Sequence, residues 1–301
     1  MNHNRREKIA FWAGAVGIAS NMLLFAAKLG VGLWANSISI VSDAFNNLSD
    51  LGSAVVAVLG FKLSSRPPDK EHPHGHGRLE YVAALIVSFI IFTVGLELLH
   101  SSVRKVLQPE PVDFSSTVVM VLVLSIAVKL GLFIYNRWVA GRIGSSLNRA
   151  VAFDSLSDAI ATTAILVGAI IQEAFELTLD GYFGTVLALL IMYTGFSTAK
   201  ESVDLLVGIS ADPELVNRIE TLLLSGKGVK GVHELRVHDY GPGRTFASVH
   251  AEVDPEASIV DMHAEIDDIE KRIADELGVK MVIHMEPVLP DKEERDRGGQ
   301  A

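Results

Sequence analysis

Six long apolar stretches constrain this chain more than any other feature of its sequence. Each is long enough to cross about 30 Å of hydrocarbon as a helix, which takes roughly 20 residues. A bilayer offers the backbone no hydrogen-bond partners, so stretches of this kind must span it as helices. We therefore predict an α-helical membrane protein with six transmembrane helices, over residues 1–208. The helices are expected near residues 9–35, 38–63, 80–106, 114–138, 150–173 and 181–206.

The composition agrees with a membrane bundle that carries a polar appendage. Of the 301 residues, 49% are hydrophobic and the mean hydropathy is +0.34, which is too apolar for an ordinary soluble protein. The first apolar stretch begins near Ile9 and is longer than the hydrophobic region of a signal peptide, and no cleavage site follows it. We expect this stretch to be retained as a membrane span.

The distribution of Lys and Arg predicts how the spans are oriented. Basic residues precede the first stretch and flank the second and fourth connections, whereas the other three connections contain none. Arg104 and Lys105, at the end of the third stretch, are the exception. The positive-inside rule then predicts a multi-pass protein of the cell inner (plasma) membrane with both termini in the cytoplasm.

The chain changes character after Asp212-Pro213 and becomes typical of a small soluble domain. Helical spacing predicts helices near residues 213–225 and 259–273, and alternation predicts strands near 232–239, 247–253 and 279–286. This α-β-β-α-β order indicates a compact cytoplasmic α+β domain of metallochaperone or ferredoxin-like type over residues 209–290. Residues 291–301, which are rich in charged residues and Gly, are expected to form a disordered tail.

The net charge of −10 lies almost wholly in the last third of the chain. Residues 208–301 hold 11 Lys and Arg against 20 Asp and Glu. Such a field attracts cations and argues against nucleic acid as a partner, since phosphates require a basic surface. The chain has no Cys, so any metal site must use imidazole, carboxylate, amide or water ligands.

Polar residues inside two of the apolar stretches predict an ion site. Asn46 and Asp50 lie in the second stretch, and Asp154 and Asp158 lie in the fifth. Each pair has i,i+4 spacing and therefore lies on one helix face. Carboxylates cost several kcal/mol in hydrocarbon unless paired or hydrated, so they usually mark ion or proton pathways. Asp43 precedes Asn46 on the same stretch, and we assign it a supporting or proton-handling role.

Two alternatives to an ion site follow from the same residues. The carboxylates could be protonated and join neighbouring helices by hydrogen bonds. Lys28 and Lys129 are also rival partners, because salt bridges from them would neutralise the site and prevent strong binding of a dication. We expect both lysines to have a structural or snorkelling role.

Two motifs give the chain a family resemblance. The segment SDAFNNLSD, from Ser42 to Asp50, and the segment DSLSD, from Asp154 to Asp158, resemble the cation diffusion facilitator family of metal/proton antiporters. The resemblance implies six spans, a His-bearing loop after the second span and a cytoplasmic α-β-β-α-β domain. It also implies that the two i,i+4 pairs form the transport site of a homodimer, which exports a cytoplasmic dication in exchange for protons.

The donor atoms at this site favour manganese. Zinc carriers of the family typically have His or Asp where this chain has Asn46, and His where it has Asp154. Oxygen-only donors suit hard ions such as Mn²⁺, whereas imidazole favours Zn²⁺. The arrangement also resembles the manganese-exporting branch of the family. Fe²⁺ and Zn²⁺ remain alternatives, together with Cd²⁺ and Co²⁺.

The resemblance implies two further metal sites. One is a loop site of Asp69, His72 and His76, in which His74 matches no ligand and is expected to be an exposed loop residue. The other belongs to the cytoplasmic domain, where Glu286 replaces the usual Asp. Its ligands would be His233, His250, His263, His284 and Glu286. The alternative is that these are surface histidines of an acidic domain.

Two other classes of function are less well supported by the sequence. A membrane metal sensor or scaffold that does not transport would need only the cytoplasmic histidines, not the intramembrane carboxylates. An enzyme is not expected, because the chain has no HExxH pair and no Walker lysine motif. We expect no cofactor other than the bound or transported metal, and as partners metal ions, protons, membrane lipid and a second copy of the chain.

Overall fold

The computed structural model describes residues 3–64, 66–110, 112–143, 146–175, 177–241 and 243–288. The predicted tail at residues 291–301 lies outside this part of the chain. The chain forms two compact units, one of Met1–Val58 with Ala84–Glu201 and one of Leu59–Ala83 with Ser202–Ala301. The loop that carries Asp69, His72 and His76 therefore belongs to the same unit as the C-terminal domain. The predicted boundaries at residues 208 and 290 stay predictions.

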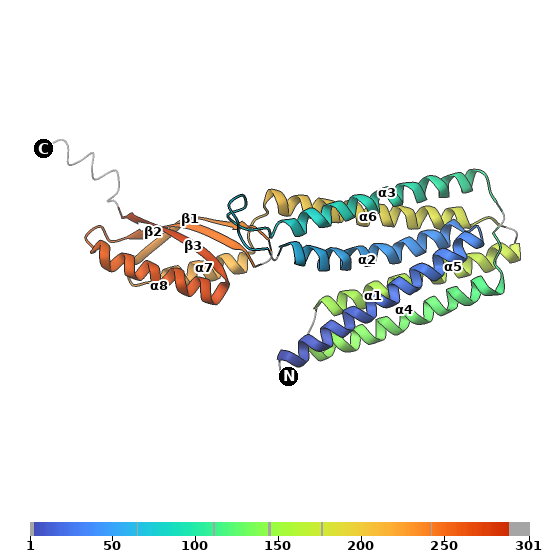
Figure 1. Ribbon diagram of the computed structural model, residues 1–301, viewed down its shortest axis with the longest axis horizontal. Helices are drawn as coiled ribbons and strands as arrows, with labels where there is room; N and C mark the ends of the chain where they lie inside the picture. Colours follow the sequence, from blue (N-terminus) through green and yellow to red (C-terminus); the bar gives the residue numbers. More distant parts are fainter. Residues whose placement is uncertain are drawn as a thin grey trace. The chain divides into compact units, whose positions relative to one another are not determined.

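Six long helices form at the places that the hydropathy predicts, and they run side by side in Figure 1. Five of them are long and apolar enough to cross a membrane, which confirms five of the predicted spans. Among the described residues, α2 does not meet this criterion; its first half carries Asp43, Asn46, Asn47 and Asp50. The helices are α1 (His3–Trp34), α2 (Ile38–Ser64), α3 (Leu79–Leu107), α4 (Ser116–Ile143), α5 (Ser146–Phe175) and α6 (Asp180–Val207).

A buried carboxylate joins the start of α2 to the start of α6. Asp180, the first residue of α6, accepts hydrogen bonds from the backbone N–H of Ile38 at 2.8 Å and from the hydroxyl of Ser37 at 2.5 Å. Lys105 Nζ lies 3.1 Å from the same carboxylate. The first N–H groups of a helix have no partner within the helix, and an anion there is stabilised by the helix dipole. Asp180 therefore caps a helix that is distant from it in the sequence.

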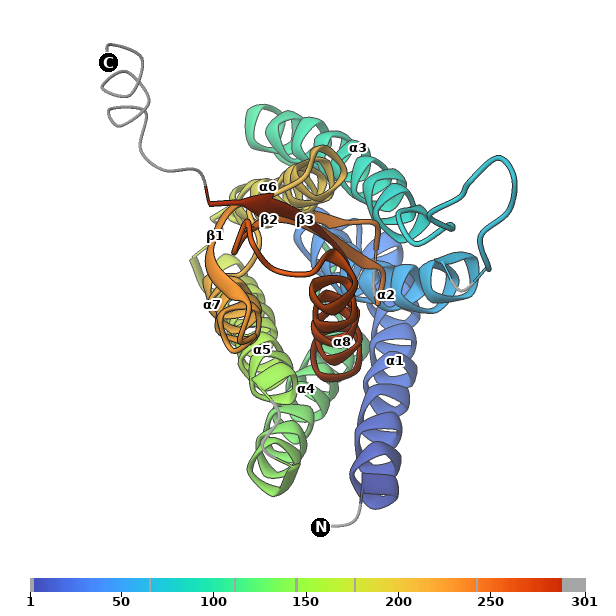
Figure 2. The ribbon, with the colours of Figure 1, turned by 90° about the vertical axis from the view of Figure 1, so that its left-hand side faces the viewer.

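The C-terminal domain has the predicted α-β-β-α-β order. It consists of α7 (Pro213–Leu224), β1 (Val229–Asp239), β2 (Thr245–Val253), α8 (Ile259–Leu277) and β3 (Val279–Pro287). The strands form one sheet in the order β1-β2-β3, in which β1 and β2 are antiparallel and β2 and β3 are parallel. Figure 2 shows α7 and α8 on the same side of this sheet.

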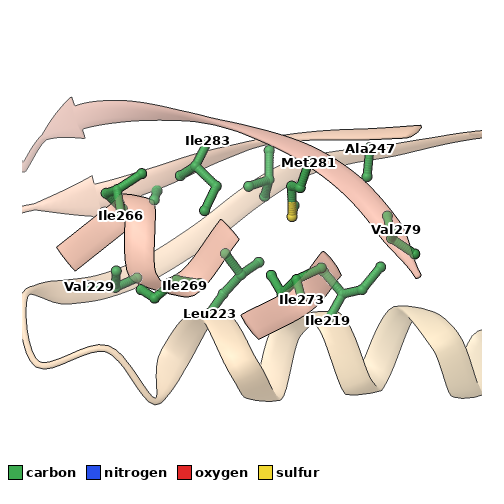
Figure 3. Packing of buried hydrophobic residues seen from close by; sticks show 12 residues of the cluster. Ile219, Leu223, Val229, Ala247, Ile266, Ile269, Ile273, Val279, Met281 and Ile283 are labelled. Carbon is green, nitrogen blue, oxygen red and sulfur yellow. The ribbon is translucent and has the colours of Figure 1, made fainter. Parts of the chain in front are cut away.

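Alternation along the strands separates the core from the opposite face of the sheet. Buried side chains of β2 and β3, such as Ala247 and Met281, share one core with Ile266 and Ile269 of α8 (Figure 3). Successive side chains of a strand point to opposite faces. His250 and the residues paired with it therefore lie on the face of the sheet away from the helices.

Candidate metal centres

The structure brings together all four residues of the predicted intramembrane site. One carboxylate oxygen each from Asp50, Asp154 and Asp158 lies within 4.8 Å of the other two. Asn46 Nδ2 donates a hydrogen bond of 2.7 Å to Asp158 Oδ1. Asn46 and Asp50 come from α2, whereas the two other aspartates come from α5. The i,i+4 spacing has placed each pair on the helix face that meets the other pair.

Burial across this site changes from one side to the other. Asp158 is buried, Asn46 and Asp50 are half-buried, and Asp154 is exposed. The cluster is therefore closed around Asp158 and accessible at Asp154.

Lys129 of α4 is part of the same cluster. Its Nζ lies 3.4 Å from Asp50 Oδ2, donates to Asp158 Oδ2, and donates to Asn21 Oδ1 at 2.8 Å. The side chain is 1% exposed, so the expectation that Lys129 snorkels to the membrane surface is wrong. One ammonium pairs with two members of a cluster of three carboxylates, so a single positive charge does not balance all three when they are ionised. If all three carboxylates are ionised, two negative charges remain for a dication.

Lys28 and Asp43 form a second buried pair that is separate from the carboxylate cluster. Lys28 Nζ lies 2.8 Å from Asp43 Oδ2 and donates to Thr162 Oγ1 at 3.0 Å. The Thr162 hydroxyl also lies 2.9 Å from Asp43 Oδ2. Both charged side chains are almost fully buried, so Lys28 does not snorkel either. This network joins α1, α2 and α5 and has the character of a structural ion pair.

The loop between α2 and α3 brings its three predicted ligands together. Ligand atoms of Asp69, His72 and His76 lie within 4.8 Å of one another, and the two imidazole rings have centroids 4.5 Å apart. Asp69 also accepts hydrogen bonds from the backbone N–H of His72 at 2.7 Å and of Glu71 at 3.0 Å. The bond from the His72 N–H is the largest cause that lowers the pKa of Asp69 below its usual value. The carboxylate is thus kept ionised for a cation.

His74 does not join these ligands, as expected, and contacts the β1–β2 turn instead. Its ring stacks on Tyr240 with centroids 4.3 Å apart and meets the edge of Phe246 at 4.9 Å. The guanidinium of Arg78 lies over the Tyr240 ring, 4.5 Å from its centroid, and donates a hydrogen bond of 2.8 Å to the Asp239 carbonyl. These contacts hold the loop against the C-terminal domain.

The sheet face opposite the helices carries most of the third predicted site. His233 Nε2 lies 3.1 Å from Glu286 Oε2, and His250 Nδ1 lies 3.3 Å from Glu286 Oε1. His284 is paired with His250 in register, and their ring centroids are 4.9 Å apart. His263 is exposed on α8 and does not belong to the cluster of three ligands found within the described residues.

Several residues at or near these sites were missed by the sequence reasoning. Asn21 and Thr162 are single polar residues in apolar stretches, and only long-range contacts identify their partners. Asp180 lies at the start of the last apolar stretch. Its partners Ser37 and Ser39 lie far from it in the sequence, so their contact with it could be identified only from the fold. Glu252, with one oxygen 3.7 Å from His233 Nδ1, could have been found by its i,i+2 spacing from His250.

Comparison with known proteins covers nearly the whole chain. Residues 15–207 match the model of the cation efflux transmembrane domain, and residues 211–288 match that of the cation efflux protein cytoplasmic domain. An uncharacterized transporter of Methanocaldococcus jannaschii is 30% identical over 248 residues, which are 82% of this chain and 87% of the relative.

Two further relatives have names that describe efflux. The cation-efflux pump FieF of Klebsiella pneumoniae is 28% identical over 274 residues, 91% of this chain and 90% of the pump. The manganese efflux system protein MneS of Bacillus subtilis is 28% identical over 280 residues, 91% of this chain and 94% of that protein. Both matched family models describe cation efflux. With both family models matched in order along its length, the chain belongs to the cation efflux, or cation diffusion facilitator, family of membrane transporters.

Proposed function

We propose that this transporter exports a divalent cation, Mn²⁺ before any other, from the cytoplasm in exchange for protons. Asn46, Asp50, Asp154 and Asp158 would bind the cation during transport. The observation that supports this proposal is the convergence of three carboxylates from two membrane helices to within 4.8 Å. Such a concentration of negative charge in a membrane is costly, and binding of a dication offsets that cost.

The preference for Mn²⁺ follows from the donor atoms. All four proposed ligands offer oxygen, which suits hard cations, and none offers the imidazole nitrogen that favours Zn²⁺. The relative from Bacillus subtilis is named a manganese efflux system protein. Fe²⁺ is close to Mn²⁺ in hardness, and Zn²⁺ binds most mixed sites more tightly, so these ions are the alternatives, followed by Cd²⁺ and Co²⁺.

Exchange for protons uses the same carboxylates. A carboxylate binds metal only when it is ionised, so binding of metal and binding of protons exclude each other at each oxygen pair. A site that faces the two sides of the membrane in turn can then release metal as it takes up protons. The accessible Asp154 and the buried Asp158 would be the first and the last of the aspartates to contact the entering ion.

The two histidine-containing clusters would bind metal on the cytoplasmic side. Asp69, His72 and His76 form the loop site, and His233, His250, His284 and Glu286 form the sheet site. We propose that the transporter is a homodimer in which a second copy supplies His263 to the sheet site, since His263 stands apart from that cluster within its own chain.

The proposed topology places the protein in the cell inner membrane with both termini in the cytoplasm. In this arrangement α2 is the sixth span, residues 1–208 form the transport domain, residues 209–290 form the cytoplasmic domain, and residues 291–301 form a tail. The polar side chains of α2 would face the interior of the bundle, which compensates for their low hydropathy.

Transport into reconstituted vesicles tests this function. With an imposed pH gradient, the intact chain should move Mn²⁺, and Asp50→Ala should abolish the movement. Asp113→Ala is the matched control, because Asp113 is an exposed carboxylate in the α3–α4 connection. The transport site is refuted if Asp50→Ala moves metal normally. Proton exchange is refuted if Mn²⁺ moves at an undiminished rate without a pH gradient and releases no protons.

A further inference from the structure

The ammonium of Lys129 occupies the position that a transported cation needs. Its Nζ contacts Asp158 Oδ2 and lies 3.4 Å from Asp50 Oδ2. These two carboxylates also supply ligand atoms of the candidate transport site. A metal ion bound to these carboxylates and the ammonium group repel each other, because both are positively charged and would lie close together. Lys129 and the substrate are therefore competitors.

Lys129 also has a second partner outside the carboxylate cluster. Nζ donates a hydrogen bond of 2.8 Å to Asn21 Oδ1 on α1. An amide oxygen can hold an ammonium without supplying a charge, and a lysine has four rotatable methylene groups with which to shift its head. The side chain can thus withdraw toward Asn21 without leaving the buried interior or breaking all of its hydrogen bonds.

Lys28 shows what a purely structural lysine of this bundle contacts. It is fully buried and pairs with one carboxylate, Asp43, and one hydroxyl, Thr162. Neither Asp43 nor Lys28 belongs to a cluster of converging ligands among the described residues. Lys129, in contrast, pairs with two carboxylates, Asp50 of α2 and Asp158 of α5, that belong to such a cluster. The two lysines therefore differ in whether a dication has a reason to displace them.

We propose that Lys129 is a tethered counter-cation of the transport site, which holds Asp50 and Asp158 when the substrate is absent and withdraws to Asn21 when the substrate binds. This proposal rests on the proposed function, because it assigns the competitor of the same site. The ammonium keeps its charge throughout, so only its position changes. Lys129 weakens substrate binding and assists release by returning to the carboxylates.

Equilibrium binding of Mn²⁺ to the full-length protein in lipid nanodiscs tests the proposal. The measurement uses a background that carries His72→Ala and His250→Ala, so that the loop and sheet clusters do not contribute, with Asp50→Ala in this background as the blank. Lys129→Met should lower the Kd for Mn²⁺ by about tenfold or more, because a positive charge close to the ion is removed. Lys28→Arg, which keeps the other buried pair, should leave the Kd unchanged.

Asn21 gives the proposal a second and opposite test. Asn21→Leu removes the alternative partner of the ammonium and should raise the Kd by about threefold to tenfold, since loss of a hydrogen bond to a charged group has this order of effect. In the double variant with Lys129→Met, Asn21→Leu should have no further effect. If Asn21 were instead a direct metal ligand, Asn21→Leu would weaken Mn²⁺ binding both with and without Lys129→Met.

The outcomes separate this inference from the proposed function. If Lys129→Met leaves the Kd unchanged or weakens binding, Lys129 is a structural residue and the inference is overturned. Lys129→Gln, which keeps a hydrogen-bond donor without the charge, replaces Lys129→Met if that variant does not fold as a single species in gel filtration. Absence of any Asp50-dependent Mn²⁺ binding in the unmodified Lys129 background would overturn the proposed function itself.

Discussion

The intramembrane cluster and the sheet-face cluster have the same number of converging ligands but opposite surroundings. Asp50, Asp154 and Asp158 lie between membrane helices, whereas His233, His250 and Glu286 lie on a solvent-accessible sheet face. The first cluster contains a buried lysine that contacts two of its members. Within the described residues, no Lys or Arg forms an ion pair with the second cluster.

This difference shows how the environment determines what a metal site requires. Water screens the charges of an exposed cluster, so its ligands need no fixed counter-charge. In a membrane interior, several carboxylates together must be balanced by protons, by a metal or by a basic side chain. An intramembrane site therefore depends on its counter-cation for stability, whereas an exposed site can lose a ligand without harm to the fold.

The largest effect in this comparison is expected from Asp158→Asn. It removes a proposed metal ligand and also the closest partner of the buried Lys129. We expect Mn²⁺ transport to fall by about 100-fold or more, and the free energy of unfolding to fall by about 3–5 kcal/mol, the usual cost of breaking a buried pair. Vesicle transport and thermal unfolding in detergent measure the two effects. Asp50→Asn is the control and should lose less stability, since Asp50 is half-buried and lies 3.4 Å from Lys129 Nζ. Equal losses of stability in the two variants would show that the buried pair of Lys129 and Asp158 has no special weight.

A change of donor atom should alter selectivity at the accessible side of the site. Asp154→His introduces an imidazole, and we expect the ratio of Zn²⁺ to Mn²⁺ transport to rise by about tenfold or more. Asp154→Asn removes the charge without adding an imidazole and should lower transport of both ions. Unaltered Zn²⁺ and Mn²⁺ rates in Asp154→His would remove the chemical basis for the manganese assignment.

Loss of a ligand from the sheet face should affect binding without abolishing transport. His250→Ala is expected to weaken Zn²⁺ binding to the C-terminal domain of the intact protein by about tenfold or more, and to change Mn²⁺ transport by no more than about threefold. His238→Ala is the matched control, because His238 is exposed on β1. A complete loss of transport in His250→Ala would show that the exposed site is as indispensable as the intramembrane one.

A smaller effect is expected where the loop contacts the β1–β2 turn. His74→Ala removes the ring that stacks on Tyr240, and such ring pairs contribute about 0.5–1.5 kcal/mol. We expect faster hydrogen exchange in residues 66–78 and unchanged metal binding at Asp69, His72 and His76. Lys70→Ala, a substitution at an exposed position of the same loop, should leave the exchange rates unchanged. If His74→Ala also exchanged at the rate of the unsubstituted protein, the His74 ring would not hold the loop.

The smallest effect concerns the pH dependence of the loop. The backbone N–H of His72 is the main group that lowers the pKa of Asp69. The stabilisation that Asp69 gives the loop is therefore fully present above the unfolded-state pKa of about 4 and is lost as the pH falls through the lower folded-state pKa. Carboxyl ¹³C titration by NMR should place the midpoint of Asp69 below 3.8. A midpoint at or above that value would show that these hydrogen bonds do not form in solution.

Much of the fold could be predicted because hydropathy and alternation are local properties of the sequence. The six long helices lie where they were predicted, although α1 begins at His3 rather than near residue 9 and α4 ends at Ile143 rather than near residue 138, and the order of the soluble elements is confirmed. The largest error in a strand is at β1, which starts at Val229, three residues before the predicted start near 232. Gly231 interrupts the hydrophobic pattern there and coincides with an irregularity in the pairing with β2.

The candidate sites could be predicted only as far as helix and strand periodicity extends. The i,i+4 spacing placed Asn46 with Asp50 and Asp154 with Asp158, and the structure has these pairs face to face. Lys129 is different, because its position on an apolar helix does not tell which neighbouring helix it faces. From the sequence we expected a structural or snorkelling lysine, with an ion pair to the carboxylates as the rival, and only the packing of α4 against α5 identifies the ion pair.

Among the described residues, the two fully buried lysines are each paired with a carboxylate on the helix that follows them in the chain. Lys28 on α1 pairs with Asp43 on α2, and Lys129 on α4 pairs with Asp158 on α5. An isolated charge near the centre of a membrane helix costs about 2.5–3.5 kcal/mol during insertion. Helices that enter the bilayer as consecutive hairpins would bring each lysine together with its counter-ion. The order of these charges along the chain therefore suits stepwise insertion during synthesis, in which Lys28 and Lys129 each receive a counter-ion from the next helix to be made.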